Sequence, residues 1–549
     1  MSLLPSLSNN TLIINSSACS SQSATCPLPI PTLFQWSGAD TVSGDNKTIS
    51  PEHTPSEWDA TQAALLNMSG SGQFFSERMV LHPDGNVDES DILSYLVMAI
   101  SNSYAATFPG GASYTLDSGF FSLYAGEQIF SWPDVNGYVW HNNRTLPDAY
   151  QSGYIPSTSY GLHIGSVNAN VSGSLVLGGY DSSRCLTEPL ISDSQSVTLT
   201  GISLNVSSGG YAYENASSVP IQNLLRANGS SLDKLEVYPD PGVPYLYLPQ
   251  DTCDAIAAHL PVTYDSDYNL YFWNTSSQSY TDIISSPHYL EFTFSGGSSG
   301  PSSTTINIPF ALLNLTLENP LVSTDTQYFP CSPWTPSSAG YHLGRSFLQG
   351  AFLAQNWDSS TLFLAQAPGP GALPENVKTI AYTDTTLTPE SNPPSWDSTW
   401  SSTLTALSAN TNSTTGSGSG SSSSTSSTLS GGAIAGIVVG VIVLLALVAA
   451  LVFFLIRRRR RKNQASQMPE QEELRPYYGS SDAGALGKGP LQYYDHSPDG
   501  TPIDSQKPTD MHNGVALPLA EAPGHADPVE MEAPQEPQEL DSGQTRFKH

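Results

Sequence analysis

One uninterrupted apolar segment constrains this chain more than any other feature of its sequence. From Ala433 to Ile456 all 24 residues are apolar or glycine. As an α-helix they would span about 36 Å, and the hydrocarbon core of a bilayer is roughly 30 Å thick. A helix of this composition has no polar face, so it does not suit the surface of a globular domain. We therefore predict that residues 432–456 form a single transmembrane helix.

The residues on either side of this segment predict its orientation. Residues 457–462 are five arginines and a lysine, and positive residues next to a membrane helix remain in the cytosol. Twelve Asn-x-Ser/Thr sequons precede the segment, and none occurs in the 87 residues after Lys462. Such sites are used only in the secretory pathway, so we predict a single-pass type I protein of the plasma membrane with an extracellular, glycosylated ectodomain. The sequon asparagines are Asn9, Asn15, Asn46, Asn67, Asn143, Asn170, Asn205, Asn215, Asn228, Asn274, Asn314 and Asn412.

Charge and cysteine content exclude several classes of protein. The chain has 19 Lys and Arg against 49 Asp and Glu, a formal net charge of -30. This balance argues against a nucleic-acid partner, because the phosphate backbone attracts basic proteins. The five cysteines have no CxxC spacing, and the 11 histidines show no metal-ligand spacing. We expect no metal site and no cofactor.

The first 368 residues are predicted to form an all-β domain. Short apolar or alternating runs such as YLVMAI and YLEFTF recur about every ten residues, with Gly, Ser, Asn and Pro between them, a pattern typical of strands and turns. The clearest helical pattern runs from Gln250 to Leu260, with Ile256, Ala257 and Leu260 on one face.

Two further segments are predicted to lack a core. Residues 369–430 contain recurring prolines and then a Ser/Thr/Gly run, in which 15 of the 20 residues from Thr411 to Ser430 are Ser or Thr. We expect an extended stalk, because such a composition buries too little apolar surface to fold. Residues 457–549 are predicted to be a basic collar followed by a disordered acidic tail.

The tail contains candidate docking sites for cytoplasmic partners. Phosphorylation there would add charge and hydrogen-bond acceptors to an accessible segment. Tolerated linker sequence without a partner is an equal alternative. The candidate residues are Tyr477, Tyr478, Tyr493, Tyr494, Ser497 and Thr501.

Three stretches of the ectodomain resemble pepsin-like aspartic proteases, in particular the divergent fungal cell-surface branch. Residues 160–181 (YGLHIGSVNANVSGSLVLGGYD) look like the hairpin with the family's G-x-L-x-x-G-G-x-D signature. Residues 240–260 resemble the second active-site loop with the strand and helix that follow it, and residues 341–367 resemble the closing strands. The resemblance covers about residues 1–368. It implies a bilobal fold with a lobe boundary near residues 185–200.

The resemblance also implies two disulfides and a start site upstream of this sequence. The pairs are Cys19 with Cys26 and Cys253 with Cys331, which leaves Cys185 without a partner. The first 13 residues contain no signal peptide. Either the membrane helix itself directs targeting or the native start lies upstream. We expect the second, because the resemblance places Met1 partway along a strand and the family's first strands before it.

Aspartic proteolysis needs two carboxylates that share a proton and a water, one from an Asp-Thr/Ser-Gly loop in each lobe. The resemblance places residues 240–242 (Asp-Pro-Gly) at the second loop, where Pro241 replaces the hydroxyl residue. It places residues 6–8 (Ser-Leu-Ser) at the first loop, and Ser6 supplies no carboxylate. Asp240 would then be a vestigial catalytic residue. The triplet 117–119 (Asp-Ser-Gly) is better interpreted as a segment late in the first lobe.

These features predict a catalytically inactive, pepsin-like protein of the cell surface. Its cleft would bind or sense an extended peptide or a cell-wall protein. Two alternatives remain open: an active, membrane-anchored aspartic endopeptidase that works at acid pH, with Asp240 and an unrecognised partner, and a structural cell-wall mannoprotein.

Overall fold

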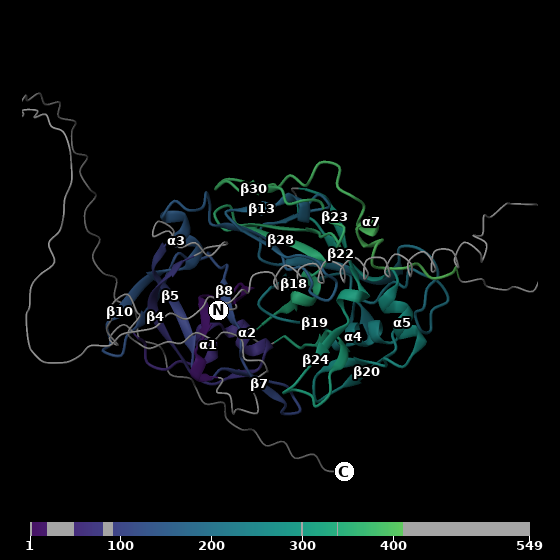
Figure 1. Ribbon diagram of the computed structural model, residues 1–549, viewed down its shortest axis with the longest axis horizontal. Coiled ribbons are helices and arrows are strands. Elements are labelled where there is room, and N and C mark those ends of the chain that lie inside the picture. The colour runs from purple at the N-terminus through teal and green to yellow at the C-terminus, as the bar shows by residue number, and fades with distance from the viewer. Residues whose placement is uncertain (1–2, 19–48, 81–91, 298–299, 337–338, 410–549) are drawn as a thin grey trace, which may run out of the picture. The chain divides into compact units, whose positions relative to one another are not determined.

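The computed structural model describes residues 3–18, 49–80, 92–297, 300–336 and 339–409 (Figure 1). The predicted transmembrane segment, the collar and the tail lie outside these residues, as do Asn46, Asn412, Cys19 and Cys26. None of the described helices is both long enough and apolar enough to cross a membrane.

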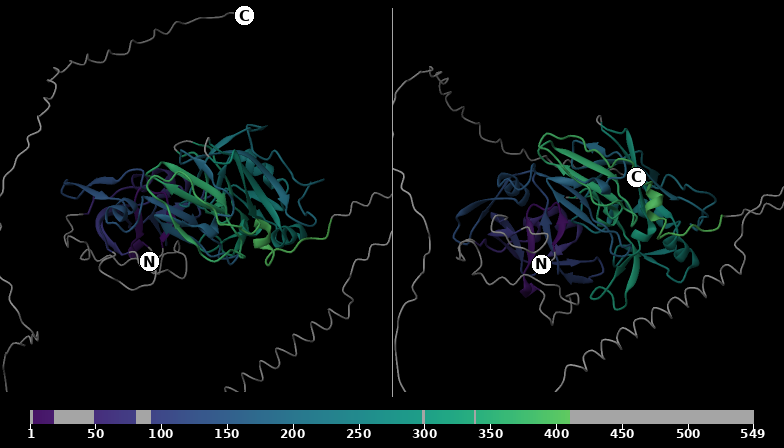
Figure 2. Two further views of the ribbon diagram at one scale, coloured as in Figure 1. Left: turned by 90° about the horizontal axis from the view of Figure 1, so that it is seen from above. Right: turned by 45° about the horizontal axis from the view of Figure 1, so that its top comes forward.

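The described chain is built mainly from strands, as predicted, and it has two halves that each centre on a seven-stranded sheet. The two halves lie side by side in Figure 1 and in both views of Figure 2. The first sheet comprises β1 (Leu3–Ser6), β8 (Gly119–Ser122), β2 (Thr11–Ile14), β5 (Ile92–Ser101), β10 (Val139–Asn143) and β9 (Ile129–Pro133), with β4 (Gly72–Val80) on β5. The second sheet comprises β23 (Ser303–Pro309), β22 (His288–Ser295), β15 (Val197–Val206), β18 (Leu235–Pro239), β27 (Tyr341–Leu343), β19 (Leu246–Leu248) and β26 (Cys331–Pro333).

A five-stranded sheet combines segments that are far apart in sequence. Its central strands β28 and β29 carry the runs AFLAQN and TLFLAQ, and every residue of both is buried. Continuous apolar runs of this kind suit strands that are covered on both faces. The strand order is β12 (Ser174–Leu177), β11 (Ser159–His163), β28 (Ala351–Asn356), β29 (Thr361–Gln366) and β14 (Leu190–Ser192).

Smaller sheets and short helices complete the described fold. The remaining strands are β20 (Val262–Asp265), β21 (Leu270–Trp273), β25 (Thr326–Phe329), β24 (Leu315–Leu317), β3 (Met68–Ser69), β6 (Ala105–Thr107), β7 (Ser113–Thr115), β13 (Gly179–Asp181), β30 (Val377–Thr379), β16 (Arg226–Ala227) and β17 (Ser230–Ser231). The α-helices are α1 (Pro55–Trp58), α2 (Ala60–Leu65), α3 (Thr145–Gln151), α4 (Gln250–Ala257), α5 (Gln278–Ser285), α6 (Arg345–Leu348) and α7 (Trp396–Trp400).

Helix α4 is the helix predicted for residues 250–260, and it ends three residues early. Ile256 and Leu260 are buried, as the pattern requires, whereas Ala257 is partly exposed. Pro261 explains the early end, because the residue before a proline avoids the helical conformation.

The folded part continues beyond residue 368, where the sequence placed the start of the stalk. Strand β30 pairs antiparallel with β13, and Ile380 has no exposed surface. Trp400 in α7 is 2% exposed and belongs to the main hydrophobic core. The prediction of an extended stalk from residue 369 is therefore wrong for residues 369–409, because a few large apolar side chains in this polar segment bury enough surface to hold it on the domain.

The two large sheets contain the same four-strand arrangement. In the first, β1 is parallel to β8, β8 is antiparallel to β2, and β2 is parallel to β5. In the second, β18 is parallel to β27, β27 is antiparallel to β19, and β19 is parallel to β26. Ser6 ends β1 and Asp240 directly follows β18. The repeat therefore places Ser6 and Asp240 at corresponding points of the two halves.

Candidate functional site

The loops that carry Ser6 and Asp240 meet between the two halves. Ser6 is fully buried and Asp240 is 5% exposed. A Cβ atom on Gly242 would lie 2.9 Å from Ser6 Oγ. The structure thus brings together the two segments that resemble active-site loops in the sequence.

Backbone contacts fix the position of the Asp240 carboxylate. Its Oδ1 accepts a hydrogen bond from Gly242 N at 2.8 Å, and its Oδ2 lies 3.3 Å from His342 Nδ1. The backbone N–H of Asp240 donates to Leu343 O on β27. A Cβ on Gly344 would fall on the carbonyl oxygens of Val243 and Tyr245, so only glycine lets these two loops approach so closely.

The Arg345 side chain binds the backbone of the Asp240 loop. Its Nη1 donates to the carbonyl oxygens of Pro241 at 3.0 Å and Gly242 at 2.9 Å. No local sequence pattern predicts this contact, because it joins residues more than 100 positions apart. It supplies the loop with side-chain support although Pro241 offers no hydroxyl.

Replacing Arg345 by methionine is expected to destabilise the protein by about 2 kcal/mol, because two carbonyl groups lose a charge-assisted hydrogen bond. Methionine keeps most of the apolar stem. Urea denaturation of the full-length protein measures the effect. Arg226→Met is the matched control, because the described side-chain hydrogen bond of Arg226 goes to the carbonyl oxygen of the exposed Gly229. Equal stability of the wild type and the Arg345 variant would contradict the assignment.

Gln62 fills the space between the two loops. Its side chain is 1% exposed, and its Nε2 donates to Ser6 Oγ. A Cβ on Gly242 would overlap the same Nε2 atom. Ser6 Oγ also accepts a hydrogen bond from Ser8 N. A hydroxyl and an amide therefore fill the space between the Ser6 and Asp240 loops.

The helix that carries Gln62 is short but firmly held. Asp59 caps α2, because its Oδ1 accepts a hydrogen bond from Gln62 N at 2.8 Å. The preceding Trp58 has no exposed surface and donates from its indole to Asn10 O. At the other end Leu65 packs with Val243 in a small apolar cluster. Helix α2 thus lies against the Asp240 loop along its length.

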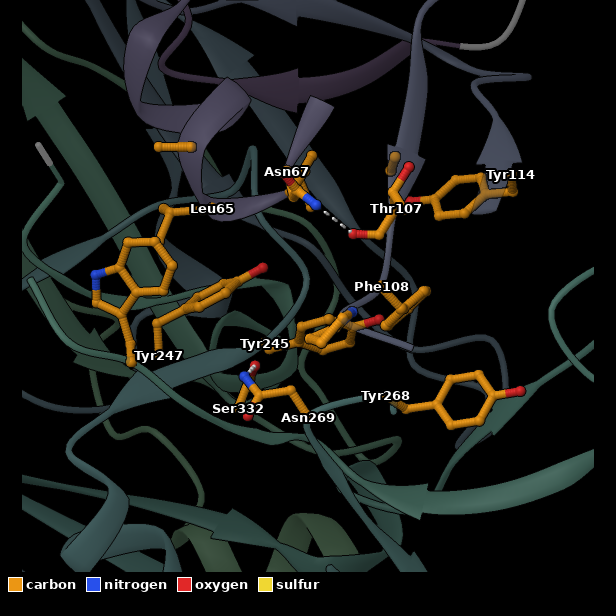
Figure 3. Close-up of a pocket in the computed structure, with 15 residues that line it drawn as sticks. Leu65, Asn67, Thr107, Phe108, Tyr114, Tyr245, Tyr247, Tyr268, Asn269 and Ser332 are labelled. Carbon is orange, nitrogen blue, oxygen red and sulfur yellow. Dashed lines mark hydrogen bonds between the residues drawn. The ribbon is translucent and has the colours of Figure 1, made fainter. Parts of the chain in front are cut away.

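An aromatic pocket of about 390 Å³ lies on one side of α2 (Figure 3). Residues of both halves line it, and none of these lining residues is charged. Tyr247 is 2% exposed, and its hydroxyl has no hydrogen-bond partner in the part of the chain that the structure describes. Figure 3 shows this hydroxyl directed toward the other lining residues. The residues that line this aromatic pocket include Leu65, Asn67, Thr107, Phe108, Tyr114, Tyr245, Tyr247, Tyr268, Asn269, Ser332 and Trp334.

An acidic pocket of about 300 Å³ includes Asp59 and Gln62 of the α2 segment. Asp240 also lines it, together with Tyr238 and His342. Burial and then the negative charge of Asp240 raise the pKa of Asp59 to about 6, against the hydrogen bonds from Gln62 N and Asn9 N. The sequence reasoning missed Asp59, because an Asp before a short helix signals only a cap.

The other predicted site residues have mixed outcomes. The disulfide between Cys253 and Cys331 is present, and Cys185 is a buried free thiol whose pKa burial raises to about 12. Asp117 precedes β8 of the first sheet, as its interpretation as a late segment of the first lobe requires. The described residues contain no group of His, Cys, Asp or Glu that could hold a metal ion.

The sequon asparagines that the structure describes all have exposed or partly exposed side chains. Four of the fully exposed ones have positive φ angles between 46° and 53°, as is common for asparagine in tight turns. Their glycosylation remains a prediction. These four are Asn67, Asn170, Asn215 and Asn228.

Comparison with known proteins gives one kind of match. No protein-family model matches the sequence, and no curated protein matches it. Among solved structures, the fold is similar to that of an aspartic proteinase from Irpex lacteus, with 14% sequence identity and a TM-score of 0.35. The match covers 55% of this chain and 78% of that one. This similarity concerns the fold alone and assigns no activity to the chain.

Proposed function

We propose that this chain is a cell-surface protein of pepsin-like fold that binds peptides between its two halves without cleaving them. The contact of Ser6, Gln62 and Gly242 carries the proposal. Among the described contacts of the Asp240 carboxylate are a backbone amide and an imidazole, and no carboxyl group hydrogen-bonds to it. Without a second carboxylate there is no pair to share a proton, and loss of one member of such a unit removes most of the catalysis.

The peptide-binding part of the proposal rests on the two pockets beside α2. The aromatic pocket has a volume typical of ligand sites, an apolar lining and an unpartnered Tyr247 hydroxyl. Such a lining suits a large uncharged side chain with a polar tip, such as tyrosine. Helix α2 covers the Asp240 loop between the pockets, so a ligand would reach both without contacting the Ser6 hydroxyl.

The proposed location is the outer face of the plasma membrane, with a single type I span. The apolar segment 432–456, the basic residues 457–462 and the twelve sequons support it. The tail after the collar would then be available for phosphorylation and cytoplasmic partners.

A second candidate is an aspartic endopeptidase in which Asp59 replaces the missing carboxylate. One observation favours it: Asp59 lines the same pocket as Asp240, and its pKa of about 6 would suit a group that keeps a proton. Both Asp59 oxygens accept backbone N–H groups, however, which indicates a capping role.

The test uses the full-length protein in detergent and a fluorescent peptide that carries one tyrosine. At pH 4 and pH 7, with and without pepstatin, we expect the anisotropy of the peptide to rise and mass spectrometry to find no inhibitor-sensitive cleavage. Cleavage that disappears in Asp240→Ala would overturn the proposal, and cleavage that also disappears in Asp59→Asn would establish the second candidate. Absence of binding and cleavage would leave a structural role in the cell wall.

A further inference from the structure

The acidic pocket has a charge imbalance that its own residues do not neutralise. Asp59 is 7% exposed and Asp240 is 5% exposed. No lysine or arginine is among the residues that line the pocket. Two carboxylates held in one partly buried space repel each other and lose hydration. A cation in this pocket would offset both effects.

The groups around the carboxylates come from several elements. Asp59 precedes α2, Tyr238 belongs to β18, and His342 belongs to β27. His342 is the sole lining side chain that could become cationic, and its Nδ1 lies 3.3 Å from Asp240 Oδ2. It faces Asp240, so Asp59 has no basic side chain of this pocket as a partner.

A second observation also points to a ligand. Gln62 lines the acidic pocket and is 1% exposed, yet its Oε1 has no hydrogen-bond partner among the described residues. Buried polar atoms are rarely left unpaired. A carbonyl oxygen without a partner accepts only a donor, so the missing partner of Gln62 carries an N–H or O–H group.

We propose that the acidic pocket binds the ammonium or guanidinium group of a basic peptide side chain, with Asp59 and Asp240 as counter-charges and Gln62 Oε1 as an acceptor. A group with several N–H donors meets all three requirements at once. The pocket volume of about 300 Å³ accommodates a lysine or arginine side chain, whose aliphatic stem would pack on Tyr238. This inference rests on the proposed function and adds the chemistry of the ligand.

The test compares two peptides that differ only in charge. Both carry the tyrosine of the test above and, a few residues away, either lysine or norleucine, which has a similar stem without the ammonium group. Fluorescence anisotropy with the full-length protein at pH 7 is expected to give a Kd at least tenfold lower for the lysine peptide. In Asp59→Asn the preference should fall below threefold, while the asparagine still caps α2.

Controls separate this inference from the proposed function. Asp233→Asn removes an exposed acid of the second half, and it should keep the tenfold preference. In the wild type the preference should also fall at pH 5, because Asp59 with a pKa of about 6 is then mostly protonated. Equal binding of both peptides would overturn the cation site and leave the proposed function standing. Failure of both peptides to bind would overturn the cation site and the proposed function together.

Discussion

Acidification from pH 7 to pH 4.5 is expected to lower the free energy of unfolding by about 3 kcal/mol. The main cause is two buried histidines whose pKa values burial lowers from 6.5 to about 4, His163 and His288. His288 Nε2 accepts the N–H of Ala212, and His163 Nδ1 has no partner in its buried site. Neither ring can take up a second proton without loss of a hydrogen bond or burial of an unpaired N–H group.

The direction follows from proton uptake by the unfolded chain. Above pH 6.5 both imidazoles are neutral in the folded and in the unfolded protein, so the free energy of unfolding does not change. Between pH 6.5 and 4 the unfolded state binds protons that the folded state does not, so each histidine costs about 1.4 kcal/mol per pH unit until its folded pKa is reached. Asp59 acts in the opposite sense, because its raised pKa lets the folded state bind a proton first between about pH 6 and 3.8. At pH 4.5 each histidine has cost about 2.7 kcal/mol and Asp59 has contributed about 2 kcal/mol in the other direction, so the net loss is about 3 kcal/mol.

Urea denaturation at pH 7, 6, 5 and 4.5 and constant ionic strength measures this effect. His288→Gln should remove most of the net loss, because this ring alone contributes about 2.7 kcal/mol of it at pH 4.5. His141→Gln is the control, because His141 is exposed and its described side-chain hydrogen bond is to an exposed serine. Stability that stays constant or rises toward pH 4.5 would contradict the prediction. It would also favour the acid endopeptidase, which has to remain folded in that range.

Removal of the disulfide between Cys253 and Cys331 is expected to cost about 4 kcal/mol. Both cysteines are fully buried, and the bond joins helix α4 to β26, which pairs with β19 of the second sheet. The two residues are 78 positions apart, so the bond removes a large loop-closure entropy from the unfolded chain. The double variant Cys253→Ala with Cys331→Ala loses this constraint together with a small amount of core volume.

The denaturation midpoints of the double variant and of the wild type with and without dithiothreitol measure the effect. Reductant should bring the wild type close to the double variant and leave that variant unchanged. Cys185→Ala is the control for a buried cysteine without a disulfide, and it should cost about 1 kcal/mol. A double variant as stable as this control would show that the bond adds nothing.

Local patterns in the sequence were sufficient for part of the fold. Alternation in the run HYLEFTF predicts a strand, and in β22 its Leu290, Phe292 and Phe294 have no exposed surface. Helix periodicity likewise located α4. These features depend on neighbours within a few residues, which is why a single sequence reveals them.

The same local reasoning failed for residues 369–409. Their prolines and polar residues are typical of a linker, and only contacts with distant segments, such as β30 with β13, hold them in place. Composition describes what a segment can bury on its own. It does not describe what another segment offers as a partner.

The sequence by itself determined the apolar segment, the acidic composition, the sequons and the mostly β fold. Tertiary structure alone decided what stands beside Asp240. Gln62 is 56 residues from Ser6 and lies far from Gly242 in the chain, yet its amide touches both loops. Asp59, which caps α2, lines the acidic pocket together with Asp240. Pairing of strands that are far apart in the chain creates these contacts. No local pattern encodes such pairing, because the surfaces that stabilise it meet only when both halves have folded.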